Sequence, residues 1–243
     1  MENNSQDVLG RSSALLHAIN HKKTRLHLRY LGHRESGERR VHEEDEITSL
    51  ILGPLSLLPS KSVAYFWSNF ISFLGGHLPS KEPMSADMSF WPRRPSTKIE
   101  PDIFVNLHWD DSSTTSILVE LKWRSGLSGE DQLHRQWLEF LSKEERKTGI
   151  HLFLAPTTVA AEAARSLEDI WGPRLIAATW IKTLSFLHEL RNDHNAEGLL
   201  PWITQITKTM DFLSIRPFRG FSNLEKDIPF SEPAISPVIF FKR

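Results

Sequence analysis

The 243-residue sequence contains no cysteine, which excludes disulfides and thiolate metal sites and suits a reducing compartment. Long apolar runs are also missing, because no uninterrupted stretch approaches the roughly 18 residues that a membrane span needs. The first twenty residues lack the basic start and apolar segment of a signal peptide. We therefore expect a soluble, cytoplasmic protein without a membrane partner.

The chain has no strong excess of charge of either sign, with 29 Lys and Arg against 30 Asp and Glu. The whole protein therefore has no strong electrostatic attraction to nucleic acid, although a local patch could still provide one. Three sequence motifs are absent as well: GxxxxGK[ST], the dinucleotide glycine fingerprint and GxSxG. Their absence argues against an ATPase, a dehydrogenase and an α/β-hydrolase, and we expect no nucleotide cofactor.

The composition, 40% hydrophobic and 24% charged, suits one large domain with a substantial core. The one basic stretch spans 22–42. We interpret 1–42 as a basic N-terminal extension and 43–243 as the main domain. The extension is either a solvated arm or an edge that contacts phosphates.

Hydrophobic periodicity predicts alternating helices and strands after residue 42. A helix begins at the acidic cluster near Glu44, because carboxylates in a first turn suit the helix dipole, and Pro54 bends or ends it. The further predicted elements are a helix at 60–74, a loop at 75–99 with room for a short strand, strands at 103–109 and 116–123, a long helix at 129–146, a strand at 151–155, a helix at 158–167, a strand at 174–180, helices at 181–191 and 198–213, and irregular structure from Phe218. This order predicts an α/β fold with a central mixed sheet flanked by helices, and additional C-terminal helices.

The two strands at 103–109 and 116–123 form a predicted hairpin with one apolar face. That face is made of alternate residues: Ile103, Val105, Leu107, Trp109, Ile117, Val119, Leu121 and Trp123. Burying both stripes together pairs odd residues with odd residues. Asp102, Glu120 and Lys122 are then on the opposite face, and a turn near Ser112 puts Asp102 level with Lys122.

Two carboxylates that converge on one point repel unless a proton or a cation lies between them. Oxygen ligands suit Mg²⁺, with Mn²⁺ as a substitute, and the backbone carbonyl of Leu121 could supply another. Lys122 could orient or help deprotonate a water and offset the charge that grows on a phosphate. These residues favour phosphodiester hydrolysis, and the alternative is a hairpin whose polar face is simply wet.

The pattern Pro101-Asp102 followed by Glu120-Leu121-Lys122 resembles the PD-(D/E)XK nuclease superfamily, which includes restriction endonucleases and RecB-like nucleases. The resemblance covers roughly 40–155 and implies a restriction endonuclease-like core. It implies that Gln132 orients the site, with Gln136 one helical turn later. Trp137 is at best the equivalent of a tyrosine that usually follows in the family.

The family's first helix contributes a glutamate, and Glu44 is the chosen candidate, with Glu43 and Glu46 as alternatives. The resemblance then assigns the metal to Asp102, Glu120, Glu44 and the Leu121 carbonyl. Lys122 and Gln132 complete the catalytic set.

This resemblance implies a Mg²⁺-dependent endodeoxyribonuclease, acting in bacterial defence against foreign DNA. A compact nuclease of this kind usually obtains specificity elsewhere, so we expect a homodimer or a partner protein. The alternatives are a non-catalytic DNA-binding or assembly module on the same fold and a structure-specific junction or flap nuclease in DNA repair.

Three further features have competing interpretations. His17 and His21, spaced i, i+4, could bind a metal but lack a third ligand. Arg93 and Arg94 either contact phosphates of the scissile strand or cover a loop. Trp91 is the best candidate for base stacking, whereas three other tryptophans, in apolar periodic segments, are expected in the core: Trp137, Trp171 and Trp180.

Overall fold

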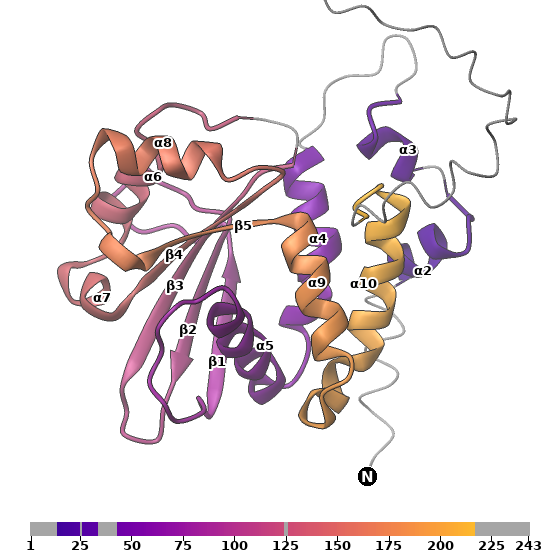
Figure 1. Cartoon of the computed structure of the whole chain (residues 1–243), viewed down its shortest axis with the longest axis horizontal. Coiled ribbons are helices and arrows are strands. Elements are labelled where there is room, and N and C mark those ends of the chain that lie inside the picture. Colours follow the sequence, from indigo (N-terminus) through magenta and orange to yellow (C-terminus); the bar gives the residue numbers. More distant parts are fainter. Residues whose placement is uncertain (1–13, 25, 34–42, 124–125, 217–243) are drawn as a thin grey trace, which may run out of the picture.

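A computed structural model describes residues 14–24, 26–33, 43–123 and 126–216 (Figure 1). These residues contain a five-stranded mixed sheet in the order β1-β2-β3-β4-β5. The strands are β1 (Ser85–Phe90), β2 (Ile103–His108), β3 (Thr114–Leu121), β4 (Ile150–Ala155) and β5 (Leu175–Thr179). β1 pairs antiparallel with β2 and β2 with β3, whereas β3, β4 and β5 run parallel to one another.

Helices precede, connect and follow the strands. Those before the sheet are α2 (Ala14–Asn20), α3 (Leu26–Tyr30), α4 (Glu43–Ser56) and α5 (Ser60–Phe73). Between strands lie α6 (Gln132–Arg135), the π-helix η1 (Gln136–Phe140), α7 (Lys143–Thr148), α8 (Val159–Leu167) and the 3-10 helix η2 (Gly172–Arg174). The chain continues with α9 (Trp180–Leu190), the 3-10 helix η3 (His194–Leu199) and α10 (Leu200–Phe212). The predicted α/β class, with a mixed sheet and C-terminal helices, is confirmed.

The sheet is covered on both faces (Figure 1). The odd-numbered hairpin stripe packs into a large core with α4, α5, α9 and α10. The even-numbered face, with Phe104 and Leu118, packs into a second core beneath α6, η1 and α8. Parallel strands joined by crossover helices are commonly buried on both sides in this way.

The hairpin register confirms the predicted parity but corrects its level. Ile103 pairs with Val119 and Val105 with Ile117, so odd residues pair with odd. Continuing this pairing puts Asp102 opposite Glu120 rather than Lys122. The difference arises because the Trp109 N–H bonds to the Ser113 carbonyl and Ser112 adopts a left-handed φ of 64°, which closes the turn one residue earlier.

The predicted long helix at 129–146 is wrong, because the segment is broken after Phe140. Leu141 is buried and extended, with ψ of 134°. Ser142 then begins α7 with a capping box, in which its hydroxyl and the Glu145 side chain each bond the other's backbone N–H. The Arg146 guanidinium donates to the carbonyls of Leu138 and Leu141, at 2.7 and 2.6 Å, and so satisfies the end of η1.

Pro54 does not end α4, which continues to Ser56. The short strand for which 75–99 had room is β1. In the part of the chain that the structure describes, no helix is both long enough and apolar enough to cross a bilayer.

The described part of the predicted N-terminal extension packs onto the domain. Leu16, Ile19 and Tyr30 are buried in the large core, and α2 lies against α10. The rest of the basic stretch, the side chain of His17 and the tail from Phe218 lie outside the described residues.

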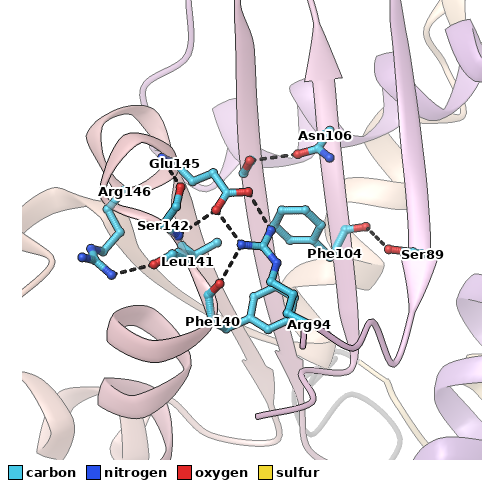
Figure 2. Close-up of polar contacts among 10 residues, drawn as sticks. Ser89, Arg94, Phe104, Asn106, Phe140, Leu141, Ser142, Glu145 and Arg146 are labelled. Carbon is cyan, nitrogen blue, oxygen red and sulfur yellow. Dashed lines mark hydrogen bonds and ion pairs between the residues drawn. The ribbon is translucent and has the colours of Figure 1, made fainter. Parts of the chain in front are cut away.

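Arg94 ties the loop before β2 to α7 (Figure 2). Its guanidinium donates to both carboxylate oxygens of Glu145, at 2.7 and 2.6 Å, and to the Phe140 carbonyl at 2.7 Å. It also lies 4.3 Å from the centroid of the Phe140 ring and 5.1 Å from that of Phe104. This geometry agrees with the loop-covering interpretation of Arg94, whereas the side chain of Arg93 is 85% exposed and pairs with Glu100.

We predict that Arg94→Met lowers the free energy of unfolding at pH 7 by about 1.5–3 kcal/mol, because it removes charge-assisted hydrogen bonds. Hydrogen bonds from Arg94 lower the pKa of Glu145 to about 2. This contribution is therefore present above the ordinary carboxyl pKa of 4.5 and is lost as the pH falls toward 2. Urea unfolding at pH 7 and pH 3 measures it. Arg93→Met is the matched control, and equal effects of the two substitutions would contradict the assignment.

Candidate active site

Three carboxylates from separate elements meet at one end of the sheet. Glu44 lies in the first turn of α4, Asp102 directly precedes β2, and Glu120 is near the end of β3. One oxygen from each lies within 4.8 Å of the others. Since β2 and β3 are antiparallel, the start of one strand adjoins the end of the other, and this brings Asp102 to Glu120.

Glu120 is the most deeply buried of the three, with 2% of its surface exposed. Its Oε1 accepts a hydrogen bond from Gln132 Nε2 at 2.6 Å and lies 2.7 Å from Lys122 Nζ. Its Oε2 accepts from Gln136 Nε2 at 2.5 Å. A buried carboxylate is costly unless its oxygens are hydrogen-bonded or paired, and here both oxygens have donors.

Lys122 lies between two carboxylates, with Nζ 2.7 Å from Glu44 Oε1 and 2.7 Å from Glu120 Oε1. Its backbone is held on both sides, because its N–H donates to the Leu154 carbonyl and its carbonyl accepts from Trp180 Nε1. Burial lowers the pKa of Lys122, but the Glu120 and Glu44 carboxylates outweigh burial and raise it above its ordinary value. In this arrangement the ammonium donates hydrogen bonds and cannot accept a proton from water.

Asp102 Oδ2 accepts a hydrogen bond from the Leu121 N–H at 2.6 Å. Because N–H and C=O of one strand residue point to the same side, the Leu121 carbonyl also faces the side on which Asp102 lies. Burial and the charge of Glu120 raise the pKa of Asp102 to about 8, against the opposing effects of the Leu121 N–H and Lys122.

Burial likewise raises the pKa of Glu120. The carboxylates therefore cannot all ionise without cost in the absence of a further cation. A divalent cation would offset this repulsion. The donor set is made only of oxygens, which fits Mg²⁺ or Mn²⁺.

The structure brings together all five side chains that the sequence singled out. Lys122, Gln132 and the three carboxylates form one connected cluster. Among the alternatives to Glu44, Glu46 instead pairs with Arg29 at 3.0 Å and accepts from the Tyr30 hydroxyl. The alternative of a hairpin with a solvated polar face does not fit the structure. Only 2% of Glu120 and 7% of Lys122 is exposed, and the second core lies on the same face of the sheet.

Sequence reasoning gave too little weight to Gln136 and missed His151. Gln136 contacts Glu120 as directly as Gln132 does, and their i, i+4 spacing was the available signal. His151 is a lone polar residue in an apolar strand, and its Nε2 lies 3.1 Å from Gln136 Oε1. Trp137 is stacked on His151 in the second core.

The tryptophans expected in the core are there: Trp137, Trp171 and Trp180 are all buried. Trp91, the candidate for base stacking, is half-buried and lies with its ring centroid 5.6 Å from that of Phe90.

No protein-family model, curated protein or solved structure matches this chain.

We predict that Asp102→Asn raises the thermal midpoint in EDTA. The amide oxygen of the asparagine can still accept the hydrogen bond from the Leu121 N–H. The substitution removes a negative charge whose burial destabilises the metal-free fold. Because the folded-state pKa of about 8 lies above the ordinary 3.8, Asp102 destabilises the fold progressively as pH rises between these values. At pH 8.5 we expect the midpoint to rise by about 2–4 °C or more, since 1 kcal/mol corresponds to that shift in a chain of this size.

Scanning calorimetry at pH 4, 6 and 8.5 measures this difference. Asp87→Asn is the control, because the Asp87 side chain is 82% exposed on β1. A midpoint for Asp102→Asn below that of the wild type at pH 8.5 would show that the ionised carboxylate stabilises the metal-free fold.

Proposed function

We propose that the protein is a Mg²⁺-dependent endonuclease that hydrolyses phosphodiester bonds of DNA, with Mn²⁺ as a substitute metal. The observation that carries the proposal is the convergence of Glu44, Asp102 and Glu120 around the buried ammonium of Lys122. Burial of charge is costly, but catalytic sites contain it because it shifts the pKa values of acids and bases to those that the reaction needs.

In this proposal Asp102, Glu120, Glu44 and the Leu121 carbonyl hold the metal. When bound, a divalent cation supplies Lewis-acid stabilisation of the charge on the phosphate. The oxygen of a water bonds to phosphorus, one P–O bond of the strand breaks, and a proton from that water ends on the strand oxygen that leaves. Lys122, held protonated, donates to a phosphate oxygen and offsets the charge of the transition state.

A cavity of about 300 Å³ opens beside the glutamines that hold Glu120. Its lining includes two glutamines, two basic and two acidic side chains: Gln132, Gln136, Lys98, Arg135, Glu100 and Asp131. The charge of this wall is balanced, so attraction of a phosphate would come from the metal and Lys122.

The choice of DNA, the role in defence against foreign DNA, and a homodimer or partner protein that supplies specificity all follow from the resemblance to PD-(D/E)XK nucleases. The near-neutral net charge of the chain agrees with a need for help in substrate recognition.

We predict that the wild-type protein nicks plasmid DNA with Mg²⁺ or Mn²⁺ and not with EDTA. Asp102→Asn and Lys122→Met should each lower the cleavage rate by about 10²–10³-fold or more, the loss typical of one transition-state-stabilising group. Asp87→Asn and Lys81→Met change exposed residues of the same types and should cleave like the wild type.

Plasmid binding without cleavage under all metal conditions would refute the enzyme and favour the non-catalytic DNA-binding module. Comparing linear, nicked, single-stranded and four-way substrates separates a general endonuclease from one specific for junctions or flaps.

A further inference from the structure

We infer that Gln136 and His151 are positioning residues that hold Glu120 in the orientation needed for metal binding. This inference rests on the proposed function and assigns a part of the site outside the motif. Glu120 Oε2 accepts from Gln136 Nε2 at 2.5 Å, and Gln136 Oε1 lies 3.1 Å from His151 Nε2. The chain of hydrogen bonds crosses β3, η1 and β4.

With Glu120 ionised, as a metal ligand must be, the order of donors and acceptors in this chain has one consistent solution. An ionised Glu120 only accepts, so the amide nitrogen of Gln136 must face it. The amide oxygen then faces His151 and can only accept, so the imidazole must carry its proton on Nε2. The other ring nitrogen, Nδ1, is buried without a hydrogen-bond partner.

The environment of His151 favours the neutral ring that this solution needs. The residue is wholly buried, and burial lowers its pKa to about 3, with a smaller effect from His134. The ring of Trp137 stacks on it at 6.0 Å with an angle of 8° between the planes. His151 pairs in register with Leu118 and Phe153 with Glu120, so the imidazole and the carboxylate share one face of the sheet.

The two glutamines hold Glu120 from successive helical turns. Gln132 donates to Oε1 and Gln136 to Oε2, so rotation of the carboxylate would break at least one bond. Gln136 is the first residue of η1, and single π-helical turns occur frequently at functional sites. Partners that orient a metal ligand in this way typically change metal affinity or activity by about 10–100-fold when removed.

His134 provides a matched control. It is also a buried histidine, and its ring lies 4.6 Å from that of Trp171, but its Nε2 faces the Glu168 carbonyl at 2.8 Å rather than the site. A substitution of His134 disturbs the same core but removes none of the hydrogen bonds that connect Glu120, Gln136 and His151.

Titration calorimetry with Mn²⁺ tests the inference on the full-length protein. We expect Gln136→Met to weaken Mn²⁺ binding by about 10–100-fold and His151→Phe to weaken it less, because Gln136 then loses only its orienting donor. His151→Gln restores an N–H donor and should bind better than His151→Phe. His134→Gln should bind like the wild type.

The outcomes separate this inference from the proposed function. Mn²⁺ binding by the wild type and equally strong binding by Gln136→Met would overturn the positioning role and leave the metal centre intact. No binding by the wild type would overturn the metal centre itself, and the positioning role with it.

A second measurement does not depend on folding of the variants. The ¹⁵N resonances of His151 in the wild-type protein should show a protonated Nε2 and a bare Nδ1. A proton on Nδ1 would refute the hydrogen-bond chain.

Discussion

Burial of one charged group, the Glu120 carboxylate, is the constraint on which the candidate site depends. An ion taken out of water needs a counter-charge and hydrogen-bond donors for both of its oxygens. Lys122 supplies the charge, and Gln132 and Gln136 supply the donors. Lys122 directly follows β3, and the two glutamines lie on the segment that crosses to β4, so satisfying one carboxylate fixes how the crossover lies on the sheet.

The same cluster lowers the stability of the metal-free fold. Lys122 neutralises part of the charge, but burial and the neighbouring charges of Glu120 and Glu44 keep the pKa of Asp102 strongly raised. A fold selected only for stability would not retain such a group, whereas a site that binds a cation needs it. The half-buried Arg94–Glu145 pair has no such excess of charge, and it joins the loop before β2 to α7.

Much of the fold could be predicted because strand and helix periods are local properties of the chain. The stripe from Ile103 to Trp109 determines which side of its strand is apolar, and matching it to the stripe from Ile117 sets the parity of pairing. The break in the helix predicted at 129–146 could not be found in this way. It depends on Ser142 as a cap and on Arg146, whose hydrogen bonds to carbonyls at the C-terminal end of η1 require the folded backbone.

Local alternation of side chains, with its period of two, is enough to put Asp102, Glu120 and Lys122 on one face of a hairpin. Whether that face is buried or wet depends on folding of the whole chain, because the covering helices come from a later part of the sequence. Glu44 and His151 reach the cluster from α4 and β4, at separations along the chain over which no local period applies.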